Sequence, residues 1–274
     1  MSDAKVAFVT GASSGIGADT ARRLHERGFT VYAAARRVEA MHQLAQRGVH
    51  VFGMDLTDDA SVTSGVAKII AEAGRIDVLV NNAGYGSYGA VEDVPLDEAR
   101  RQFEVNVFGL ARLIQLVVPH MRTRGSGRII NVSSIGGKIY EPLGAWYHAT
   151  KFAVEGFSDS LRIELRPFDI DVILIEPGPI LTQWNPIARE NMAKTSAGGA
   201  YAERAAAMAK VFEDVDAKGR SSKPVVVAEK IVKAATVKRP RARYPVGRSA
   251  GTIMRVRKIL PDKAMDAIII RMFG

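Results

Sequence analysis

The chain contains no cysteine, so it can form neither a disulfide bond nor a thiolate nucleophile or metal ligand. Aromatic residues are also scarce, at 7% of 274 residues. No apolar run approaches the roughly 18 residues that a membrane-spanning helix needs. Residues 1–17 lack the basic segment, apolar run and cleavage site of a secretory signal. These absences argue against a disulfide-stabilised secreted scaffold, and we expect a cytoplasmic protein.

Metal-binding patterns are missing as well. The five histidines do not fall at the spacings of a metal site, so we expect no bound metal. No helix-turn-helix and no interleaved basic and aromatic pattern is present, and we therefore expect no nucleic-acid binding. With 47% hydrophobic and 24% charged residues, the composition is typical of a folded globular protein. The length suits one domain, residues 1–274.

The net charge of +9 is concentrated near the C-terminus. From residue 238 to residue 274 there are ten lysines and arginines but only two acids, Asp262 and Asp266, which gives +8. This asymmetry indicates either an acidic partner or anionic surface, or simply a solvated basic face.

Short apolar, β-branched runs alternate with helical patterns along most of the chain. This alternation predicts an α/β fold with a doubly wound, Rossmann-type parallel sheet covered by helices on both faces. The predicted strands are residues 5–11, 29–36, 49–57, 76–84, 127–134, 171–178 and 242–247. The predicted helices include residues 15–28, 58–74, 97–124 and 145–168.

Two regions break the alternation. Residues 182–224 follow the sixth strand without a clear strand of their own, which predicts short helices forming a substrate lid. Residues 249–274 form a basic C-terminal extension that Pro261 divides. We expect the extension to pack on the body over a substrate pocket. Alternatively, the extension forms oligomer contacts or lies on an anionic membrane surface, and we rank the membrane last.

A glycine-rich loop, "VTGASSGIG", follows the first strand and opens the first helix. Its glycines allow a tight turn and a close approach of backbone N–H groups to a pyrophosphate at the helix N-terminus. A plain strand-to-helix turn is the alternative. The loop residues that we assign to cofactor binding are Gly11, Ser13, Ser14, Gly15, Ile16 and Gly17.

The end of the second strand helps to choose the cofactor. A preference for NAD needs an acid there, whereas this chain has Arg36 and Arg37, which suit a 2′-phosphate. The sequence therefore favours NADP(H) over NAD(H), although two solvated arginines at a helix start are the alternative. Further cofactor-binding candidates end the third and fourth strands: Asp55, Leu56, Asn82, Ala83 and Gly84.

Tyr147 and Lys151, in "WYHATKF", lie four residues apart, so on a helix they share one face. A lysine beside a phenol could favour the phenolate, or the pair could be an accident of an amphipathic helix. His148 is expected to face another side of that helix and is given no role. Leu143, Trp146 and Trp184 are candidates for an apolar substrate pocket or for the core.

The ordered motifs "TGASSGIG", "NNAG", "NVFG", "NVSS", "YHATK" and "PGPILT" resemble those of the short-chain dehydrogenase/reductase family over about residues 4–182. The resemblance implies a seven-stranded parallel sheet that binds a nicotinamide cofactor. It carries over Asn106, Ser134, Tyr147 and Lys151 as the catalytic set. In this family the serine lies thirteen residues before the tyrosine, which selects Ser134 rather than Ser133. "RGSGRIINVSSIGG" and "KFAVEGFSDSLRIEL" are most similar to the hydroxysteroid and retinol dehydrogenase branch.

The same resemblance implies roles for these residues. Tyr147 would be the general acid/base, Ser134 would hydrogen-bond the substrate oxygen, and Lys151 would bind the nicotinamide ribose. Asn106 would hold a water that passes protons to solvent. Pro177, Gly178, Ile180 and Thr182, in the last motif, would complete the cofactor-binding set with Tyr147 and Lys151.

The expected function is therefore NADP(H)-dependent hydride transfer between nicotinamide C4 and a hydrophobic ketone or secondary alcohol, in a homo-dimer or homo-tetramer. Two alternatives remain open from the sequence: a ketoreductase of carrier-protein-bound acyl chains, and a non-catalytic NADPH-binding regulator.

Overall fold

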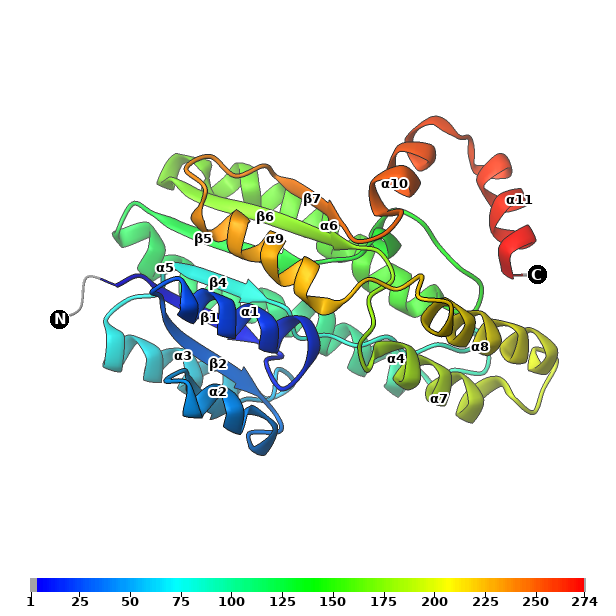
Figure 1. Cartoon of the computed structure of the whole chain (residues 1–274), viewed down its shortest axis with the longest axis horizontal. Coiled ribbons are helices and arrows are strands. Elements are labelled where there is room, and N and C mark those ends of the chain that lie inside the picture. The colour runs from blue at the N-terminus through cyan, green and yellow to red at the C-terminus, as the bar shows by residue number, and fades with distance from the viewer. Residues whose placement is uncertain (1–3, 274) are drawn as a thin grey trace.

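The computed structural model of the chain describes residues 4–273, and a seven-stranded, all-parallel sheet forms its centre (Figure 1). The strand order is β3-β2-β1-β4-β5-β6-β7. The strands are β1 (Val6–Thr10), β2 (Thr30–Ala35), β3 (His50–Gly53), β4 (Val78–Asn81), β5 (Gly127–Val132), β6 (Ile170–Pro177) and β7 (Arg243–Val246). The predicted sheet is confirmed, and only β6 begins before its predicted range, by one residue.

Helices cover both faces of this sheet (Figure 1). The α-helices of residues 4–273 are α1 (Gly15–Glu26), α2 (His42–Gln46), α3 (Asp59–Ala73), α4 (Leu96–Phe103), α5 (Gly109–Thr123), α6 (Ala145–Leu165), α7 (Trp184–Ser196), α8 (Ala202–Ala217), α9 (Pro224–Thr236), α10 (Ala250–Ile259) and α11 (Asp262–Phe273). The sheet faces are covered by α1 and α9 on one side and by α3, α5 and α6 on the other. A π-helical segment, Glu104–Phe108, joins α4 to α5.

Alternating residues of one strand face different cores, because successive side chains of a strand point to opposite faces. On β1, Ala7 and Val9 pack in the core beneath α1 and α9, whereas Val6 and Phe8 pack in the core beneath α3, α5 and α6. Both faces of the strand are therefore buried from solvent, which explains why its sequence is an unbroken apolar run.

The two irregular regions both lie beyond the carboxyl ends of the strands (Figure 1). The region after β6 holds α7 of 13 residues and α8 of 16 residues, which are longer than the predicted short helices. The C-terminal extension is a helical hairpin of α10 and α11, divided at Pro261 as predicted. Met254, Met265 and Ile269 of the hairpin pack against Ile135 and Ile139 of the body.

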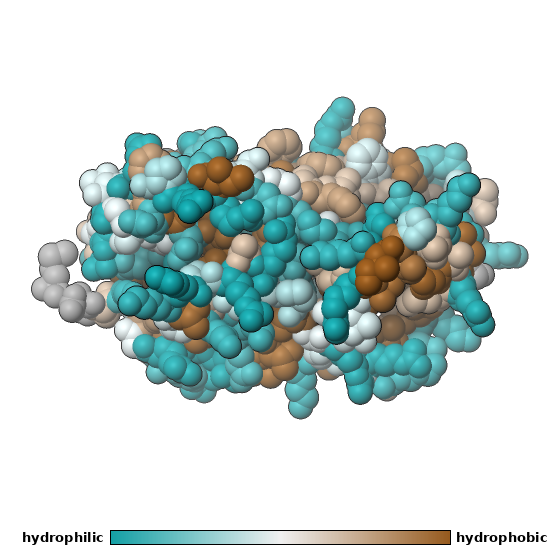
Figure 2. Space-filling view, turned by 90° about the horizontal axis from the view of Figure 1, so that it is seen from above, coloured by the Kyte–Doolittle hydropathy of each residue, from teal (hydrophilic) through white to brown (hydrophobic). Residues whose placement is uncertain are grey.

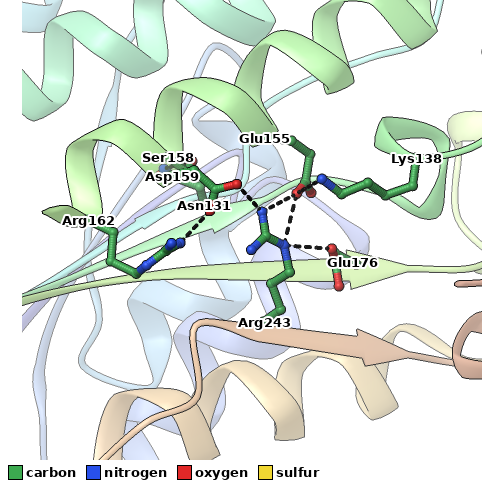
Figure 3. A network of polar contacts seen from close by, with 8 residues as sticks. All are labelled: Asn131, Lys138, Glu155, Ser158, Asp159, Arg162, Glu176 and Arg243. Atoms are coloured by element: carbon green, nitrogen blue, oxygen red, sulfur yellow. Dashed lines mark hydrogen bonds and ion pairs between the residues drawn. The ribbon is translucent and has the colours of Figure 1, made fainter. Parts of the chain in front are cut away.

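Arg243 of β7 connects the edge of the sheet to α6 through Glu155, which is buried, and Asp159, which is partly exposed (Figure 3). Its Nη2 donates to Glu155 Oε2 at 3.1 Å and to Asp159 Oδ2 at 2.6 Å, and its Nε lies 3.3 Å from Glu176 Oε1. Lys138 Nζ lies 3.1 Å from Glu155 Oε2 on the other side. Burial, followed by the charge of Glu155, raises the pKa of Glu176 to about 7, although Arg243 and Lys138 lower it.

None of the helices within residues 4–273 is long and apolar enough to cross a membrane.

Glu176→Gln should change how stability depends on pH. The pKa of Glu176 is raised in the folded protein from 4.5 to about 7, so its proton stabilises the fold at low pH and this contribution is lost as the pH rises through about 7. Glutamine stays neutral at every pH. Between about pH 5 and pH 8 the free energy of unfolding of the wild type should therefore fall relative to the variant, by on the order of 2 kcal/mol. Thermal and urea unfolding would measure this.

The exposed Glu164→Gln, on the same helix α6, provides the control and should give a flat difference over that range. Parallel pH profiles for wild type and Glu176→Gln would contradict the shifted pKa.

Candidate active site

One large cavity of about 1180 Å³ opens at the carboxyl ends of the strands. It extends from the glycine loop after β1, past the first turns of α6, to the inner faces of α7, α8, α10 and α11. Pockets for a single drug-sized ligand occupy about 300–1,000 Å³, so this volume can take a cofactor and a substrate together. The cavity lies where the strand order reverses between β1 and β4, the usual ligand position in such sheets.

The glycine loop is packed so closely that side chains would not fit. Gly11 has φ +66°, and a Cβ there would lie 2.8 Å from Ala83 Cα; a Cβ on Gly17 would lie 2.3 Å from Gly11 O. Ser14 precedes α1 in an extended conformation and its side chain does not cap the helix. The first N–H groups of α1 are therefore left for an anion in the cavity.

Thr10 and Asn82 join the ends of β1 and β4 beneath this loop. Asn82 Nδ2 donates to Thr10 O at 3.0 Å, and Thr10 Oγ1 accepts from the backbone N–H groups of Asn82 and Ala83, each at 3.2 Å. Thr10 lines the cavity but was not among the predicted residues. A polar residue that ends an otherwise apolar strand is the signal that could have identified it.

The end of the cavity near β2 and β3 is basic at its rim. Arg36 and Arg37 are exposed and line it together with Asp55. Asp55 Oδ1 accepts from Thr57 N at 3.0 Å and from Thr57 Oγ1 at 2.9 Å. Burial works in the opposite direction, but these hydrogen bonds and the charge of Arg36 hold the pKa of Asp55 below its usual value. The rim thus places two cations beside one ionised acid.

Ser134 and Tyr147 meet in the middle of the cavity. The Ser134 hydroxyl hydrogen-bonds the Tyr147 side chain, and its oxygen also accepts from Gly136 N at 3.0 Å. Burial raises the pKa of Tyr147 to about 12, and the hydrogen bond to Ser134 lowers it. In the protein by itself the phenol is therefore protonated at neutral pH and able to donate its proton.

Lys151 shares the buried face of α6 with Tyr147, as the four-residue spacing predicts. Its Nζ donates to Val132 O at 3.0 Å and lies 6.0 Å from the centre of the Tyr147 ring. Burial lowers the pKa of Lys151 to about 8, and the charge of Glu155 raises it. With Lys151 this far from the Tyr147 ring, burial rather than the lysine charge is the main cause of the raised pKa of Tyr147.

Two predicted residues do not line the cavity: Gly17, whose hydrogen packs on the loop, and Asn106. Asn106 is buried in the π-helical segment. Its Nδ2 donates to Tyr85 O at 2.9 Å and to Thr150 Oγ1 at 3.1 Å, while its Oδ1 accepts from Tyr85 N at 3.1 Å. Its amide thus holds the loop after β4 against α6. All other residues predicted for catalysis or cofactor binding line the cavity.

Aromatic side chains surround the far side of Tyr147. Its ring centre lies 5.0 Å from that of Trp184 and 5.8 Å from that of Tyr88, and Phe212 of α8 packs 5.3 Å from Tyr88. Of the three apolar candidates from the sequence, only Trp184 lines this cavity; Leu143 and Trp146 do not. The cluster was not predictable because its members come from α6, α7, α8 and the loop after β4.

His148 corrects one expectation. It does not face away from the site: its ring is buried and lines the cavity. Its Nδ1 lies 2.8 Å from Gly136 O, and its Nε2 accepts from Glu141 N at 3.0 Å. Since a carbonyl oxygen only accepts, Nδ1 donates the hydrogen bond to Gly136 O. His148 therefore positions the loop that carries Gly136 and Glu141.

The C-terminal hairpin of α10 and α11 closes one end of the cavity, which we call the apolar arm. The residues that it contributes are mostly apolar: Thr252, Ile253, Val256, Met265, Ile268, Ile269, Met272 and Phe273. The prediction that the extension packs on the body and covers a pocket agrees with this placement. Among the described residues, no three histidine, aspartate or glutamate side chains come together as metal ligands.

Comparisons with known proteins point to one family. A family model described as short chain dehydrogenase matches residues 5–193. A Helicobacter pylori protein named "Probable short-chain type dehydrogenase/reductase VdlC" is 35% identical over 263 residues, which cover 96% of either chain. A Bacteroides thetaiotaomicron protein named 3-ketodihydrosphingosine reductase is 36% identical over 264 residues, covering 96% of this chain and 95% of its own.

Solved structures agree. A short-chain dehydrogenase from Streptomyces avermitilis superposes with a TM-score of 0.83 at 33% identity, over 99% of this chain and 96% of that one. A metagenomic short-chain oxidoreductase in complex with NADP gives a TM-score of 0.69 at 28% identity, over 88% of this chain and 95% of that one. The narrower resemblance to the hydroxysteroid and retinol dehydrogenase branch stays a prediction.

Gly17→Ala should destabilise the loop that faces the cavity. Its new Cβ would lie 2.3 Å from Gly11 O, a backbone atom that cannot move without displacing the loop. We expect a loss of about 1–3 kcal/mol in the free energy of unfolding, measured by urea denaturation. Gly156→Ala on α6 is the matched control, because a Cβ there meets nothing within 4 Å and alanine favours a helix. Equal stability of the two variants would contradict the packing argument.

Proposed function

The chain belongs to the short-chain dehydrogenase family, and we propose that it is an NADP(H)-dependent oxidoreductase acting on hydrophobic ketones or secondary alcohols. The observation that carries the proposal is that one cavity joins three things: an uncapped helix N-terminus at a glycine loop, a buried tyrosine with its serine, and an apolar arm. Each has a counterpart in the reaction: a cofactor to hold, a proton to deliver, and an apolar substrate to enclose.

The residues present fit a dinucleotide. A Cβ on Gly11 would lie 2.8 Å from Ala83 Cα and one on Gly15 would lie 3.1 Å from Thr182 Cγ2, and both glycines have positive φ, +66° and +56°, so the loop keeps this path only without side chains. The N–H groups at the start of α1 would hold the pyrophosphate, and Asp55 and Asn82 would line the adenosine side.

The choice of NADP(H) rests on Arg36 and Arg37 at the rim. Both are exposed and face the end of the cavity that β2 and β3 form, where a 2′-phosphate would pair with guanidinium groups. That a similar solved structure holds NADP supports the same choice. Lys151, whose Nζ reaches Val132 O from beneath the site, would orient the nicotinamide ribose.

The nicotinamide, when bound, supplies or accepts the hydride. In reduction, the Tyr147 hydroxyl donates its proton to the carbonyl oxygen while Ser134 donates a hydrogen bond to the same oxygen. A protonated phenol is the form that burial favours here, since it raises the pKa of Tyr147 to about 12. Asn106 holds the loop after β4 in place through Tyr85.

A protonated Tyr147 is a proton donor, so its raised pKa supports reduction of a ketone rather than oxidation of an alcohol. The apolar arm, with Trp184, Phe212 and the hairpin, would exclude water from the reacting carbonyl and bind an apolar chain. The name of one relative, 3-ketodihydrosphingosine reductase, is in keeping with ketone reduction. A homo-oligomeric state stays a prediction.

Tyr147→Phe tests the mechanism. Removing the hydroxyl removes the proton donor but keeps the ring that packs on Trp184, so kcat for ketone reduction should fall by about 10²–10⁴-fold. NADPH absorbance would follow turnover, and fluorescence titration would follow NADPH binding, which should change by less than about twofold. Turnover close to wild type, with folding intact, would refute the role of Tyr147.

Replacing Arg36 with Asp and Arg37 with Ala tests the cofactor. Each guanidinium contact to a phosphate contributes about 1.5–3 kcal/mol, so the KM for NADPH should rise by about 100-fold or more, while that for NADH changes little or falls. Arg100→Ala, on the exposed face of α4, serves as the charge control. Equal effects on NADPH and NADH would remove the assignment to NADP(H).

A further inference from the structure

The turn between α10 and α11 carries the most exposed large apolar side chain of residues 4–273. This is Ile259, which is 80% exposed. Pro261 follows it and separates the two helices, so the turn stands away from the body (Figure 1). Farther along α11, Ile270 is 60% exposed. The hairpin patch, as we call it, consists of these two isoleucines and the exposed cations Arg255, Lys258, Lys263 and Arg271.

The acids of the hairpin are paired, whereas most of its cations are not. Asp262 forms an ion pair with Arg257 at 2.8 Å, and Asp266 accepts from Tyr140 OH at 2.6 Å. Arg257 also donates to Lys138 O of the body at 3.3 Å. The four cations of the hairpin patch form no ion pair with any acid in the part of the chain that the structure describes. The patch therefore presents uncompensated positive charge to its surroundings.

The same hairpin borders the mouth of the catalytic cavity. Ile268 and Met272 of α11 line the cavity and are 40% and 60% exposed, so the apolar arm reaches the surface beside this helix. On the inner side of α11, Met265 and Ile269 are buried against the body. An apolar molecule that enters beside α11 thus meets apolar side chains from the surface inward, and the hairpin patch lies on the element that forms this entrance.

We propose that the hairpin patch docks on an anionic lipid membrane, with Ile259 and Ile270 among the lipids and the four cations at the headgroups. Exposed apolar side chains on a helical element rich in lysine and arginine suit such a surface, because lipid phosphates lie directly above acyl chains. The sequence ranks this role last, since Pro261 prevents one continuous amphipathic helix. The fold removes that objection, because the break at Pro261 produces the protruding turn that carries Ile259.

A second copy of this chain is the competing occupant of the hairpin patch. Two copies related by a twofold axis would place the same patch of each against the other. The four unpaired cations of one copy would then face the four of its partner around a small apolar contact, and like charges repel. An anionic membrane matches both the charge and the apolar side chains, which is why the observations favour it.

Vesicle sedimentation of the full chain tests the charges. The wild type should bind phosphatidylcholine vesicles that contain about 30% phosphatidylglycerol at least about tenfold more tightly than pure phosphatidylcholine vesicles. This difference should shrink as salt rises from about 0.05 M to about 0.5 M. Lys258→Gln with Lys263→Gln should weaken binding by about 30-fold, since each cation near an anionic membrane contributes about fivefold.

Arg27→Gln with Arg47→Gln is the matched control, because it removes two exposed cations from the ends of α1 and α2 and should leave vesicle binding unchanged. Equal binding to the two kinds of vesicle, no binding to either, or equal losses in the two double variants would overturn the proposal.

The apolar residues are tested by Ile259→Ser with Ile270→Ser. This double variant should lose at least about tenfold in affinity for anionic vesicles, because its side chains no longer enter the apolar layer. Leu96→Ser with Ile163→Ser, at positions 58% and 69% exposed on α4 and α6, is the control and should bind as the wild type does. None of these four side chains lines the cavity, so NADPH binding, followed by fluorescence, should be unchanged in both variants and reports that the fold is intact.

Ile259→Trp provides a second readout. Its added emission should move to shorter wavelength with anionic vesicles and be quenched by brominated lipid, whereas Ile163→Trp should show neither effect. A wild-type dimer that binds no vesicles and that Ile259→Ser with Ile270→Ser dissociates would make the patch an interface between copies and would refute the proposal. These measurements need no turnover, so their failure is distinct from an absence of ketone reduction, which would contradict the proposed function instead.

Discussion

The parallel pairing of β1 with β4 is the constraint on which the site depends. Val9 pairs with Val80 in this register, and the chain leaves β1 toward α1 on one face of the sheet, whereas beyond β4 it reaches α5 on the other. The carboxyl ends of the two strands are therefore left uncovered between diverging connections. Thr10 and Asn82 close the bottom of this opening with hydrogen bonds, and the glycine loop can lie across it only because Gly11 and Gly17 have no side chains.

Helix α6 imposes a second constraint, because it buries polar residues on successive turns. Tyr147, Lys151, Glu155 and Ser158 are all buried on the face toward the sheet. Each finds a partner there: the Ser134 hydroxyl, the Val132 carbonyl, Arg243 and Asn131. Buried polar side chains are stable only when they are hydrogen-bonded or paired in this way, so the end of α6 that carries Tyr147 and Lys151 is positioned by contacts along the whole helix. Arg243 carries that support to β7 at the edge of the sheet (Figure 3).

The outer surface of the hairpin carries both polar and hydrophobic side chains, whereas the side that faces the cavity is mostly apolar. Figure 2 looks down on the side where α10 and α11 lie, and brown hydrophobic surface there is bordered by teal polar side chains. Ile259, at the end of α10, is 80% exposed, whereas Met265 and Ile269 on the inner side are buried. Five of the ten basic residues of 238–274 lie on this hairpin, which forms one wall of the cavity.

Local patterns were enough to predict the strands, the glycine loop and the spacing of Ser134, Tyr147 and Lys151. Unbroken apolar runs identify buried parallel strands, and a four-residue spacing places two side chains on one helical face whatever surrounds them. The same reasoning could not identify Thr10, His148 or Glu141 as part of the site, because each resembles an ordinary turn or helix residue in the sequence. Their importance comes from partners 12 to 72 positions away, such as Gly136 for His148 and Asn82 for Thr10.

The sequence by itself therefore determined the order of the elements, the family and the residues that share a local motif, since these follow from periodicity and short spacings. Only the tertiary structure decided which side chains line the cavity and how strongly burial shifts their pKa values. Burial, not the neighbouring lysine, raises the pKa of Tyr147 to about 12, and the folding of α7, α8 and the hairpin over the cavity produces that burial. Desolvation depends on what the whole chain packs around a group, and no local pattern of residues contains that information.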